Sequence, residues 1–329
     1  MEYFLGVDAG GSKTIGILVS NRGELVAAGI SGPASIVENG EEVARASMRS
    51  LRALLEGLHP SDTLHSAFGM PAFGESCKAD ARYYEIIAEE LGVQPKILVN
   101  DVVVGWAAGT LGHDGVHIVA GTGTIAYGRH GHKELRTSGW GSIIGDEGSA
   151  YDIGRETLRQ TSRQLDGRES PTLLRELVFE RLKLTTWQEL AEWIYAQKES
   201  ERRTTIASIA TITAEAARKG DPVARNILEH AAEELSLCVR TLVRELSLSR
   251  PLVTFSGSVL EKNEIVQRHF VNSLHHSIPH TVVRKAELHP ALGAVILLYR
   301  EVYQALPQEF LENLKETSRK FWEKVSSPA

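Results

Sequence analysis

Cysteine is scarce in this chain. Cys77 and Cys238 are the only two among 329 residues, and neither belongs to a CxxC pair or to a Cys/His cluster with the spacing of zinc ligands. The sequence therefore argues against a disulfide framework and against a structural zinc site. Isolated cysteines are typical of reducing compartments, so we expect a cytosolic protein. Cys238 lies on the apolar stripe of a predicted helix, where we interpret it as a core residue.

Long apolar runs and an excess of basic residues are also missing. The longest apolar run, residues 291–299, is too short and glycine-interrupted to span a bilayer. The first predicted strand begins almost at the N-terminus, which leaves no room for a signal peptide. With 36 Lys and Arg against 42 Asp and Glu the net charge is −6, and no basic stripe is present. We therefore expect neither a membrane nor a nucleic acid as a partner.

A glycine turn lies between two apolar runs near the N-terminus. Residues 4–7 are apolar and end at Asp8, residues 15–19 are apolar again, and this pattern predicts a β-hairpin. The turn between them consists of Gly10, Gly11, Ser12, Lys13 and Thr14. Its glycines allow several N–H groups to face one concavity that suits a phosphate, and the hydroxyls and the ammonium group add to it. Because an aspartate repels a phosphate, Asp8 indicates a divalent cation between them, bound directly or through water.

The same stretch has two other possible interpretations, a P-loop and an ordinary hairpin. A P-loop needs Gly, four residues and then Gly-Lys-Ser/Thr in front of a helix. Gly6 and Gly11 have that spacing, but Ser12 precedes Lys13 and a strand pattern follows, which excludes a P-loop. An ordinary hairpin with a glycine turn, and with Lys13 in solvent, is the simpler alternative.

The rest of the first third alternates strands and helices. A third strand at residues 25–30 would complete an antiparallel meander. A helix over 40–58 is predicted from apolar residues at helical spacing, namely Val43, Ala46, Met48, Leu51, Leu54 and Leu55. Further predicted elements are a strand at 66–70, a helix at 80–91, a strand at 96–99 and a helix at 102–109.

The pattern of the first hairpin returns at residue 116. Apolar runs at 116–120 and 125–128 enclose a turn of Gly121, Thr122, Gly123 and Thr124. This repeat suggests an internal duplication, in which each half holds one phosphate-facing turn and a nucleotide lies in the cleft between them. We expect domains at 1–113 and 114–329, the second with a helical insertion, and leave open that the last helices pack on the first domain.

A glycine-rich stretch over residues 138–149 follows the repeat. It contains Trp140, Asp146 and Glu147, which a merely connecting loop would not need. Beyond it, the period predicts helices at 149–165, 171–218, 222–248, 291–306 and 307–326, with Asp221 and Pro222 as start signals of the third. A strand at 252–255 ends at Ser256-Gly257-Ser258, a common kind of ligand position in α/β folds.

Five stretches, taken in order, identify a family. They are residues 6–14, 100–101, 121–124, 139–149 and 256–258. Together they resemble the superfamily of sugar kinases, actin and heat-shock ATPases, and within it the N-acetylglucosamine kinase group, also described as the BadF/BadG/BcrA/BcrD ATPase family. The resemblance spans residues 4–300 and is most specific at Gly139-Trp140-Gly141 and at residues 145–151.

The resemblance implies an α/β fold of two ribonuclease-H-like domains, of the actin and hexokinase type, around ATP and a sugar. Asp8 would hold Mg²⁺ through water, and Asp101 would be the catalytic carboxylate. The ATP-binding residues would be Gly10, Gly11, Ser12, Lys13, Thr14, Gly121, Thr122, Gly123 and Thr124 at the phosphates, with Ala217, Gly257 and Ser258 at the adenosine. The substrate-binding residues would be Ser35, Glu75, Asn100, Asp101, Gly139, Trp140, Gly141 and Asp146.

The chemistry of phosphoryl transfer supports the role of Asp101 independently. A sugar hydroxyl is a weak nucleophile, and a carboxylate that accepts its proton accelerates transfer by about 10²–10⁴-fold. The alternative role of Asp101 is that of a helix N-cap. Asp146 and Glu147 have a similar alternative at the positive end of the following helix; between them we choose Asp146 as the sugar ligand. Trp106 and Trp140 are predicted packing residues, although Trp140 is close in sequence to the site.

On the sugar side the sequence departs from the family pattern. The asparagine expected after the third strand is absent; Ser35 would replace it with a single hydroxyl, and Asn39 lies further along. The segment 69–75 also differs, and Glu75 is a candidate sugar contact. Both departures concern the identity of the sugar more than the kinase reaction.

We therefore predict an ATP- and Mg²⁺-dependent kinase for an amino sugar, N-acetylglucosamine at its 6-hydroxyl, with glucosamine and N-acetylmuramic acid as alternatives. One rival is an energy-coupling ATPase that activates a reductase or dehydratase, but its cysteine-bound iron–sulfur cluster does not suit two scattered cysteines. A non-catalytic sugar sensor of the same fold is the other rival, and no DNA-reading helix pair precedes residue 4. The amphipathic helix at 307–326 is a candidate surface for a homodimer.

Overall fold

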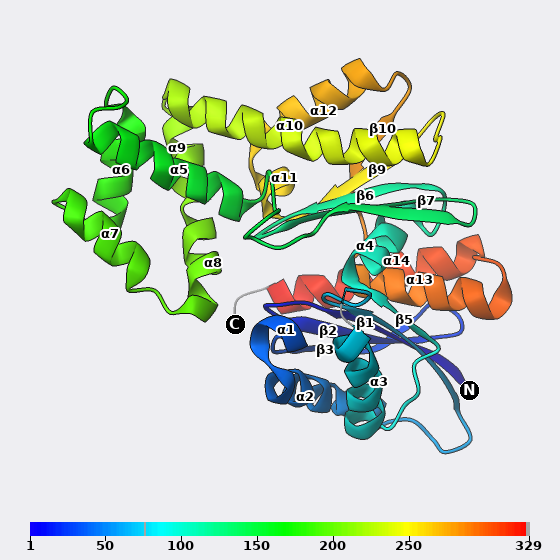
Figure 1. Cartoon of the computed structure of the whole chain (residues 1–329). Coiled ribbons are helices and arrows are strands. Elements are labelled where there is room, and N and C mark those ends of the chain that lie inside the picture. The colour runs from blue at the N-terminus through cyan, green and yellow to red at the C-terminus, as the bar shows by residue number, and fades with distance from the viewer. Residues whose placement is uncertain (76, 327–329) are drawn as a thin grey trace. The chain divides into compact units, whose positions relative to one another are not determined.

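The computed structural model describes residues 1–75 and 77–326 (Figure 1). Its contacts divide the chain into two compact units: Met1–His113 together with Ala286–Ala329, and Asp114–Lys285. The first unit therefore includes residues 286–329, whereas the expected second domain ran from 114 to 329. Among the described residues, every helix is too short or too polar to cross a bilayer.

The first unit contains a five-stranded mixed sheet in the order β3-β2-β1-β4-β5. Its strands are β1 (Glu2–Ala9), β2 (Thr14–Ser20), β3 (Leu25–Ser31), β4 (Thr63–Met70) and β5 (Ile97–Asn100). The first three pair antiparallel, which confirms the predicted hairpin and meander, and β4 and β5 continue the sheet parallel to β1. The carboxyl ends of β1, β4 and β5 therefore meet at one end of the sheet.

The second unit repeats this sheet. Its strands are β6 (Gly115–Ala120), β7 (Thr124–His130), β8 (Lys133–Ser138), β9 (Leu252–Ser256) and β10 (Val282–Lys285), in the order β10-β9-β6-β7-β8. Again three antiparallel strands are followed by two strands parallel to the first. The two glycine-cornered hairpins occupy equivalent places in the two sheets, which supports the inferred duplication.

Helices cover both faces of the first sheet. They are α1 (Ile36–Asn39), α2 (Glu41–Ser50), the 3₁₀ turn η1 (Leu51–Leu55), α3 (Cys77–Leu91), α4 (Asp101–Thr110), α13 (Pro290–Tyr303) and α14 (Gln308–Ser326). Met48 of α2 and Phe68 belong to one hydrophobic core, on the side of α2 and α3. Phe4 and Val295 belong to another, on the side of α4 and α13.

Glycine allows α13 to lie directly against the sheet and against α4. A Cβ atom on Gly6 of β1 would lie 2.4 Å from the carbonyl oxygen of Ala291, and one on Gly293 would lie 1.9 Å from that of Val104. Only a residue without a side chain permits backbone atoms to approach so closely. This packing explains why residues 286–329 group with the first unit.

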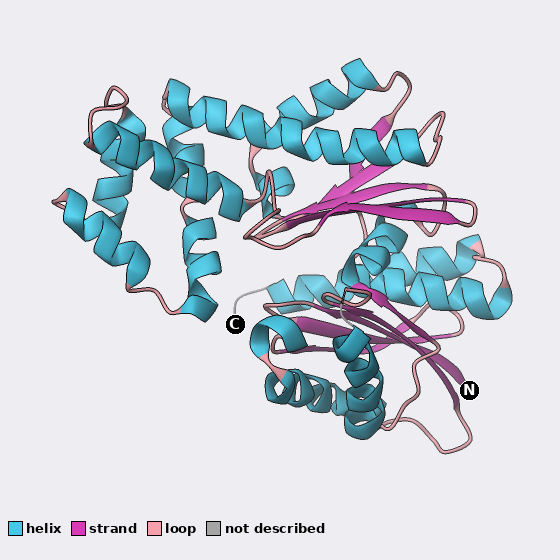
Figure 2. Ribbon diagram, viewed as in Figure 1, coloured by secondary structure: helices cyan, strands magenta, loops and turns pink. Residues whose placement is uncertain are grey.

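Helices make up most of the second unit outside its sheet (Figure 2). They are α5 (Ala150–Leu165), α6 (Leu173–Leu182), α7 (Trp187–Tyr195), α8 (Glu199–Ser208), α9 (Ala210–Arg218), α10 (Pro222–Glu245), α11 (Ser258–Lys262) and α12 (Glu264–Ser277). Helix α10 packs on β6, β7 and β8 and on α12, while α5, α6, α8 and α9 pack on one another as a helical insertion. As predicted, the Asp221 carboxylate caps α10 by accepting from the Ala224 N–H (2.8 Å), and Cys238 packs against the core.

Some elements differ from their predictions. The predicted helix over 40–58 is α-helical only to Ser50 and continues as the 3₁₀ turn. Of the predicted apolar stripe, Val43 is 40% exposed and Ala46 is exposed as well, whereas Met48 faces the core together with Ala44, which the stripe did not include. The sequence pattern predicts no strand at β8 or β10 and no helix at α1.

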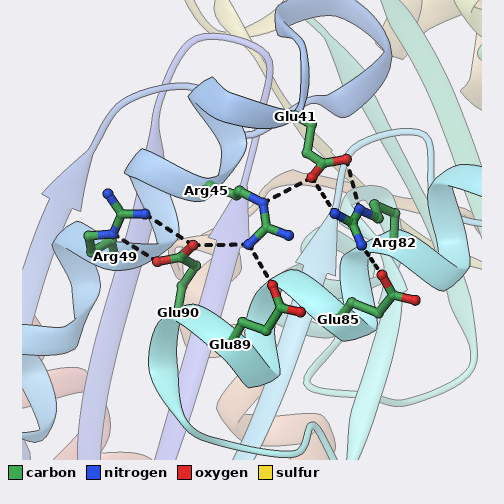
Figure 3. Close-up of polar contacts among 7 residues, drawn as sticks. All are labelled: Glu41, Arg45, Arg49, Arg82, Glu85, Glu89 and Glu90. Atoms are coloured by element: carbon green, nitrogen blue, oxygen red, sulfur yellow. Dashed lines mark hydrogen bonds and ion pairs between the residues drawn. The ribbon is translucent and has the colours of Figure 1, made fainter.

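Ion pairs join α2 to α3 on the surface of the first unit (Figure 3). Arg45 of α2 contacts Glu41 (2.9 Å), Glu89 (2.7 Å) and Glu90 (3.0 Å). The network extends through the pairs Arg49–Glu90, Arg82–Glu41 and Arg82–Glu85. Single exposed ion pairs stabilise a fold weakly, so this network mainly fixes how the two helices lie over their shared core.

Candidate active site

The β1–β2 hairpin presents the first glycine turn. The Gly10 N–H donates to the Lys13 carbonyl (3.0 Å) and closes the turn, while Ser12 and Lys13 are exposed at its tip. Thr14 is fully buried, and its hydroxyl has no hydrogen-bond partner in the described part of the chain. Because buried polar groups are normally paired, this hydroxyl indicates a ligand at the turn.

The β6–β7 hairpin presents an equivalent turn. The Gly121 N–H donates to the Gly123 carbonyl (3.0 Å), and the Gly121 carbonyl accepts from the Ala150 N–H (2.9 Å) at the start of α5. Thr124 begins β7 as Thr14 begins β2, and it too is buried with a hydroxyl that lacks a partner among residues 1–75 and 77–326. The same unpaired group in both repeats supports the prediction that both turns face phosphate.

Two carboxylates follow strand ends of the first unit. Asp8 is near the end of β1, Asp101 begins α4 directly after β5, and both residues are partly buried. Burial raises the pKa of Asp8 to about 7, against the opposing charge of Lys13. Burial, then the charge of Asp8 and more weakly those of Glu75 and Glu38, raise the pKa of Asp101 to about 8. A carboxyl that titrates near neutral pH is suited to accept a proton from an alcohol in a reaction.

The N-cap of α4 is Asn100 and not Asp101. The Asn100 side-chain oxygen accepts from the Val102 N–H (3.1 Å), and its amide nitrogen donates to the Phe73 carbonyl (3.0 Å) and to Glu75 Oε1 (3.5 Å). The alternative that Asp101 serves as the helix cap is therefore wrong. Asn100 and Glu75, both expected at the sugar, lie side by side.

Tyr83 ties together two loops of the first unit. Its buried hydroxyl accepts from the Ile36 N–H (3.1 Å) and donates to the Pro71 carbonyl (3.0 Å), so it joins the loop after β3 to the loop after β4. Ser35, the candidate replacement for the missing asparagine, is 1% exposed and caps α1 by accepting from the Glu38 N–H (3.1 Å). Ser35 thus has a structural role, and its sugar contact stays a prediction.

Asp146 lies inside the second unit, in the glycine-rich stretch between β8 and α5. It is 2% exposed, and its φ of 63° is in the left-handed region. Its Oδ1 accepts from the Thr124 N–H (3.1 Å) and its Oδ2 accepts from Arg203 Nη2 (2.8 Å). The cap of α5 is Ser149, so the alternative role of Asp146 at that helix start is not the one observed.

Trp106 and Trp140, the two tryptophans predicted to be packing residues, differ in their surroundings. Trp106 is fully buried, as its predicted packing role requires, but Trp140 is 65% exposed, so the packing interpretation of Trp140 is wrong. The Arg136 guanidinium lies 5.3 Å from the Trp140 ring centroid. Gly139 and Gly141 flank this ring with φ of 76° and 79°, values that favour glycine.

The residues expected at the adenosine lie at helix ends of the second unit. Ala217 is buried near the end of α9, and Gly257 and the exposed Ser258 open α11. A Cβ atom on Gly257 would lie 2.4 Å from the Ala120 carbonyl oxygen, so glycine is required where the end of β9 passes the end of β6.

The donor set fits a magnesium ion that arrives with a nucleotide. The described residues contain no group of three or more His, Cys, Asp or Glu side chains able to hold a metal by themselves. Mg²⁺ keeps several waters and is commonly bound by one or two carboxylates together with substrate phosphates. A single carboxylate, Asp8, beside a glycine turn therefore fits a Mg²⁺ ion that is bound together with the phosphates of a nucleotide. It does not fit a metal ion held by protein side chains alone.

The family model of the BadF/BadG/BcrA/BcrD ATPase family matches residues 5–297. The chain belongs to this family. Membership in an ATPase family implies that the protein uses ATP. An N-acetylmuramic acid/N-acetylglucosamine kinase of Clostridium acetobutylicum is 31% identical over 92% of this chain and 99% of its own length. An N-acetyl-D-glucosamine kinase of Dictyostelium discoideum is 28% identical over 90% of this chain and 97% of its own length.

A solved structure confirms the fold of this BadF/BadG/BcrA/BcrD family member. It is that of a Chromobacterium violaceum protein named as a candidate N-acetylglucosamine kinase, with a TM-score of 0.70, 21% identity, and coverage of 90% of this chain and 98% of the other. At this identity the likeness concerns the fold alone. The structure contains two mixed sheets with helices, which confirms the predicted class, an α/β fold of two ribonuclease-H-like domains.

In this ATPase-family protein, some residues that make long-range polar contacts gave no signal in the sequence. Tyr83 contacts loops 12 and 47 residues away, and Arg203 contacts an aspartate 57 residues away. His117 is fully buried with its ring nitrogens 2.9 Å from Thr254 Oγ1 and 3.0 Å from Ser256 Oγ, and burial lowers its pKa to about 3. Hydrophobic period and local motifs do not report such long-range polar contacts.

Proposed function

We propose that this protein is an ATP-dependent kinase that transfers the γ-phosphoryl group to a hydroxyl of an amino sugar, most directly the 6-hydroxyl of N-acetylglucosamine. The names of two relatives that match nearly the whole chain support an N-acetylated amino sugar as the acceptor. The kinase reaction rests on one observation above all. Asp101 stands at a strand end with a pKa raised to about 8, and the capping role at that place belongs to Asn100.

In the proposed reaction, the sugar hydroxyl oxygen forms a bond to the γ-phosphorus as the bond from that phosphorus to the β,γ-bridging oxygen breaks. ADP leaves, and the hydroxyl proton passes to Asp101. Because such transition states demand little covalent help from the protein, positioning and neutralisation of charge provide most of the rate enhancement. Asp101 has to be ionised to accept the proton, so its raised pKa favours activity at mildly alkaline pH.

The phosphates would be held by backbone N–H groups of the two glycine turns and by the unpaired hydroxyls of Thr14 and Thr124. Lys13, exposed at the first turn, would add a positive charge. Asp8 would hold Mg²⁺ through water, and the ion when bound would neutralise phosphate charge.

Replacing the carboxylate tests the proposal. Asp101→Asn should retain ATP binding and lower kcat by about 10²–10⁴-fold, because the amide cannot accept the proton. ADP release in the presence of N-acetylglucosamine measures turnover, and nucleotide binding is measured separately by calorimetry. Asp166→Asn, at an exposed acid paired with Arg168, is the matched control and should leave turnover unchanged. Wild-type turnover by Asp101→Asn would refute the base assignment.

An acceptor panel decides the substrate. N-acetylglucosamine, N-acetylmuramic acid, glucosamine and glucose are compared by kcat/KM, and coupling between phosphorus and the C6 protons in the NMR spectrum of the product identifies the hydroxyl. If glucosamine or N-acetylmuramic acid is preferred, the sugar assignment fails while the kinase assignment stands.

The same panel separates the two rival functions. Sugar binding without ADP release would indicate the non-catalytic sugar sensor. A brown, iron-containing protein would indicate the energy-coupling activator, although Cys77 is exposed and Cys238 is partly buried against the core of the second unit.

A further inference from the structure

One carboxylate of the second unit connects three parts of that unit. Asp146 Oδ1 accepts from the Thr124 N–H (3.1 Å) of the second glycine turn, and Oδ2 accepts from Arg203 Nη2 (2.8 Å) of α8. Asp146 itself belongs to the glycine-rich stretch. At 2% exposure it is almost completely removed from solvent. A buried carboxylate of this kind needs a paired charge, and Arg203 provides it.

Arg203 also packs against the turn directly. A Cβ atom on Gly123 would lie 2.4 Å from Arg203 Nη2 and 2.7 Å from Asp146 Oδ1. The guanidinium and the carboxylate therefore fill the space beside Gly123, between the second glycine turn and α8. Any residue other than glycine at position 123 would displace the ion pair.

The helix that presents Arg203 is held firmly. Helix α8 packs on α5 so closely that a Cβ atom on Gly154 would lie 2.0 Å from the Ile206 carbonyl oxygen. Helix α5 is bound to the same turn through the Ala150 N–H and the Gly121 carbonyl (2.9 Å). The turn, α5, α8 and Asp146 thus form a closed ring of contacts, in which the Arg203 guanidinium provides the ion pair to Asp146.

We propose that Arg203 is a positioning residue that orients Asp146 toward the acceptor sugar. A carboxylate offers about four lone-pair sites, and the two contacts to Thr124 and Arg203 use two of them. The others can accept hydrogen bonds from sugar hydroxyls, provided that the carboxylate is held in one orientation. The proposal rests on the proposed function, since it assigns Asp146 to the sugar, and it extends the acceptor site into the helical insertion.

Steady-state kinetics with both substrates test this role. In Arg203→Met the Thr124 N–H still holds Oδ1 of Asp146, while Oδ2 loses its ion pair with the guanidinium. We therefore expect the KM for the sugar to rise by about 10–100-fold with a smaller fall in kcat, and the KM for ATP to change by less than about fivefold. Arg203→Lys, which keeps a charged donor, should recover part of the loss. Arg202→Met, at the neighbouring residue of α8, is the matched control and should leave both KM values unchanged.

A double-mutant cycle separates positioning from general loosening. If Arg203 acts through Asp146, Arg203→Met should add little to the defect of Asp146→Asn. Additive losses, or a sugar KM within twofold of wild type in Arg203→Met, would overturn the proposal. A rise of both KM values with a lower melting temperature would do the same, because it is what a merely structural role predicts. If Arg203→Met does not fold, Arg203→Lys and Arg203→Gln take its place in the cycle.

Amide hydrogen exchange provides a readout that needs no substrate. Arg203→Met should speed exchange at Thr124 by about tenfold or more relative to Arg202→Met, since Asp146 then loses its second contact and holds that N–H less persistently. Unchanged exchange at Thr124 would count against the contact. If the wild-type protein phosphorylates no sugar on the panel, the proposed function fails and the assignment of Asp146 to the sugar fails with it. The exchange result would then report only whether Arg203 holds the turn.

Discussion

Asp8 and Asp101 illustrate a conflict between catalysis and stability at single residues. Burial disfavours the charged form of each and raises the pKa of Asp8 to about 7. Burial, and then the charge of Asp8, raise the pKa of Asp101 to about 8. A carboxyl that binds its proton more tightly in the folded than in the unfolded protein makes folding more favourable at low pH. That contribution is fully present below the ordinary pKa near 4 and is lost as pH rises through the raised values.

The nucleotide-free protein should therefore lose stability between about pH 4 and pH 8 through these two groups. Asp101→Asn removes one of them, so its melting temperature at pH 8 without Mg²⁺ should exceed that of the wild type by about 2 °C or more. At pH 4 the difference should vanish, because the wild-type carboxyl is then protonated too. Thermal unfolding at the two pH values measures this.

Glu42→Gln, at an exposed acid of α2, is the control and should show no pH-dependent gain. Equal melting temperatures of Asp101→Asn and the wild type at pH 8 would contradict the proposed burial of the charge. Such a result would also argue against the assignment of Asp101 as a base with a raised pKa. Whether Asp101 contacts the substrate would still be decided by the turnover of Asp101→Asn.

At the scale of elements, the loops on the sugar side depend on α3. Tyr83 of α3 is fully buried, and its hydroxyl serves the Ile36 N–H and the Pro71 carbonyl at once. Tyr83→Phe removes the partner of the buried Pro71 carbonyl and of the part-buried Ile36 N–H, and an unpaired buried group costs about 1–3 kcal/mol. We expect a lower melting temperature and a higher sugar KM, because the loop with Ser35 and the loop with Glu75 lose their common anchor.

Tyr84→Phe supplies the comparison for this prediction. Tyr84 is the next residue of α3 and is 44% exposed, so loss of its hydroxyl should change neither quantity. Should Tyr83→Phe alter stability and leave the sugar KM untouched, the two loops would have no part in binding the acceptor.

Much of the element order could be predicted from the sequence, for identifiable reasons. Glycine turns between apolar runs mark β1–β2 and β6–β7, and Asp221-Pro222 marks the start of α10. The strand β8 was not predicted because Lys133–Ser138 is polar. The strand β10 was not predicted because it is short, largely exposed and at the edge of its sheet. Neither has the apolar alternation by which strands are recognised.

The candidate site was predictable to a similar, limited extent. Asp101 and the glycine turns stand out locally, because chemistry-bearing residues follow apolar strands there. The capping of α1 by Ser35 and the pairing of Asp146 with Arg203 could not be foreseen, since each depends on which side chains fold back on a loop. A single sequence does not indicate which side chains 57 residues apart will contact each other in the fold.

At the scale of the whole molecule, the second unit is one continuous segment inserted into the first. Residues 114–285 form it, whereas the first unit needs both 1–113 and 286–329. A fragment of residues 114–285 should therefore fold cooperatively alone. Residues 1–113 alone should not, because the core containing Phe4 would lose Val295 and the rest of α13.

Circular dichroism and thermal unfolding of purified fragments check this prediction. Residues 1–113 joined to 286–329 by a flexible Gly/Ser linker should restore a cooperative transition that 1–113 lacks. If 1–113 unfolds cooperatively without the added segment, α13 and α14 are accessories to the first unit rather than parts of its core.

The two sheets repeat one strand topology, but not its acidic side chains. Where the first repeat has Asp8 next to the last paired residue of its leading strand, the second has Val119. The two copies thus differ at this position, which is acidic in the first sheet and apolar in the second. Only the first hairpin can therefore offer a ligand a carboxylate, so the two turns are not interchangeable.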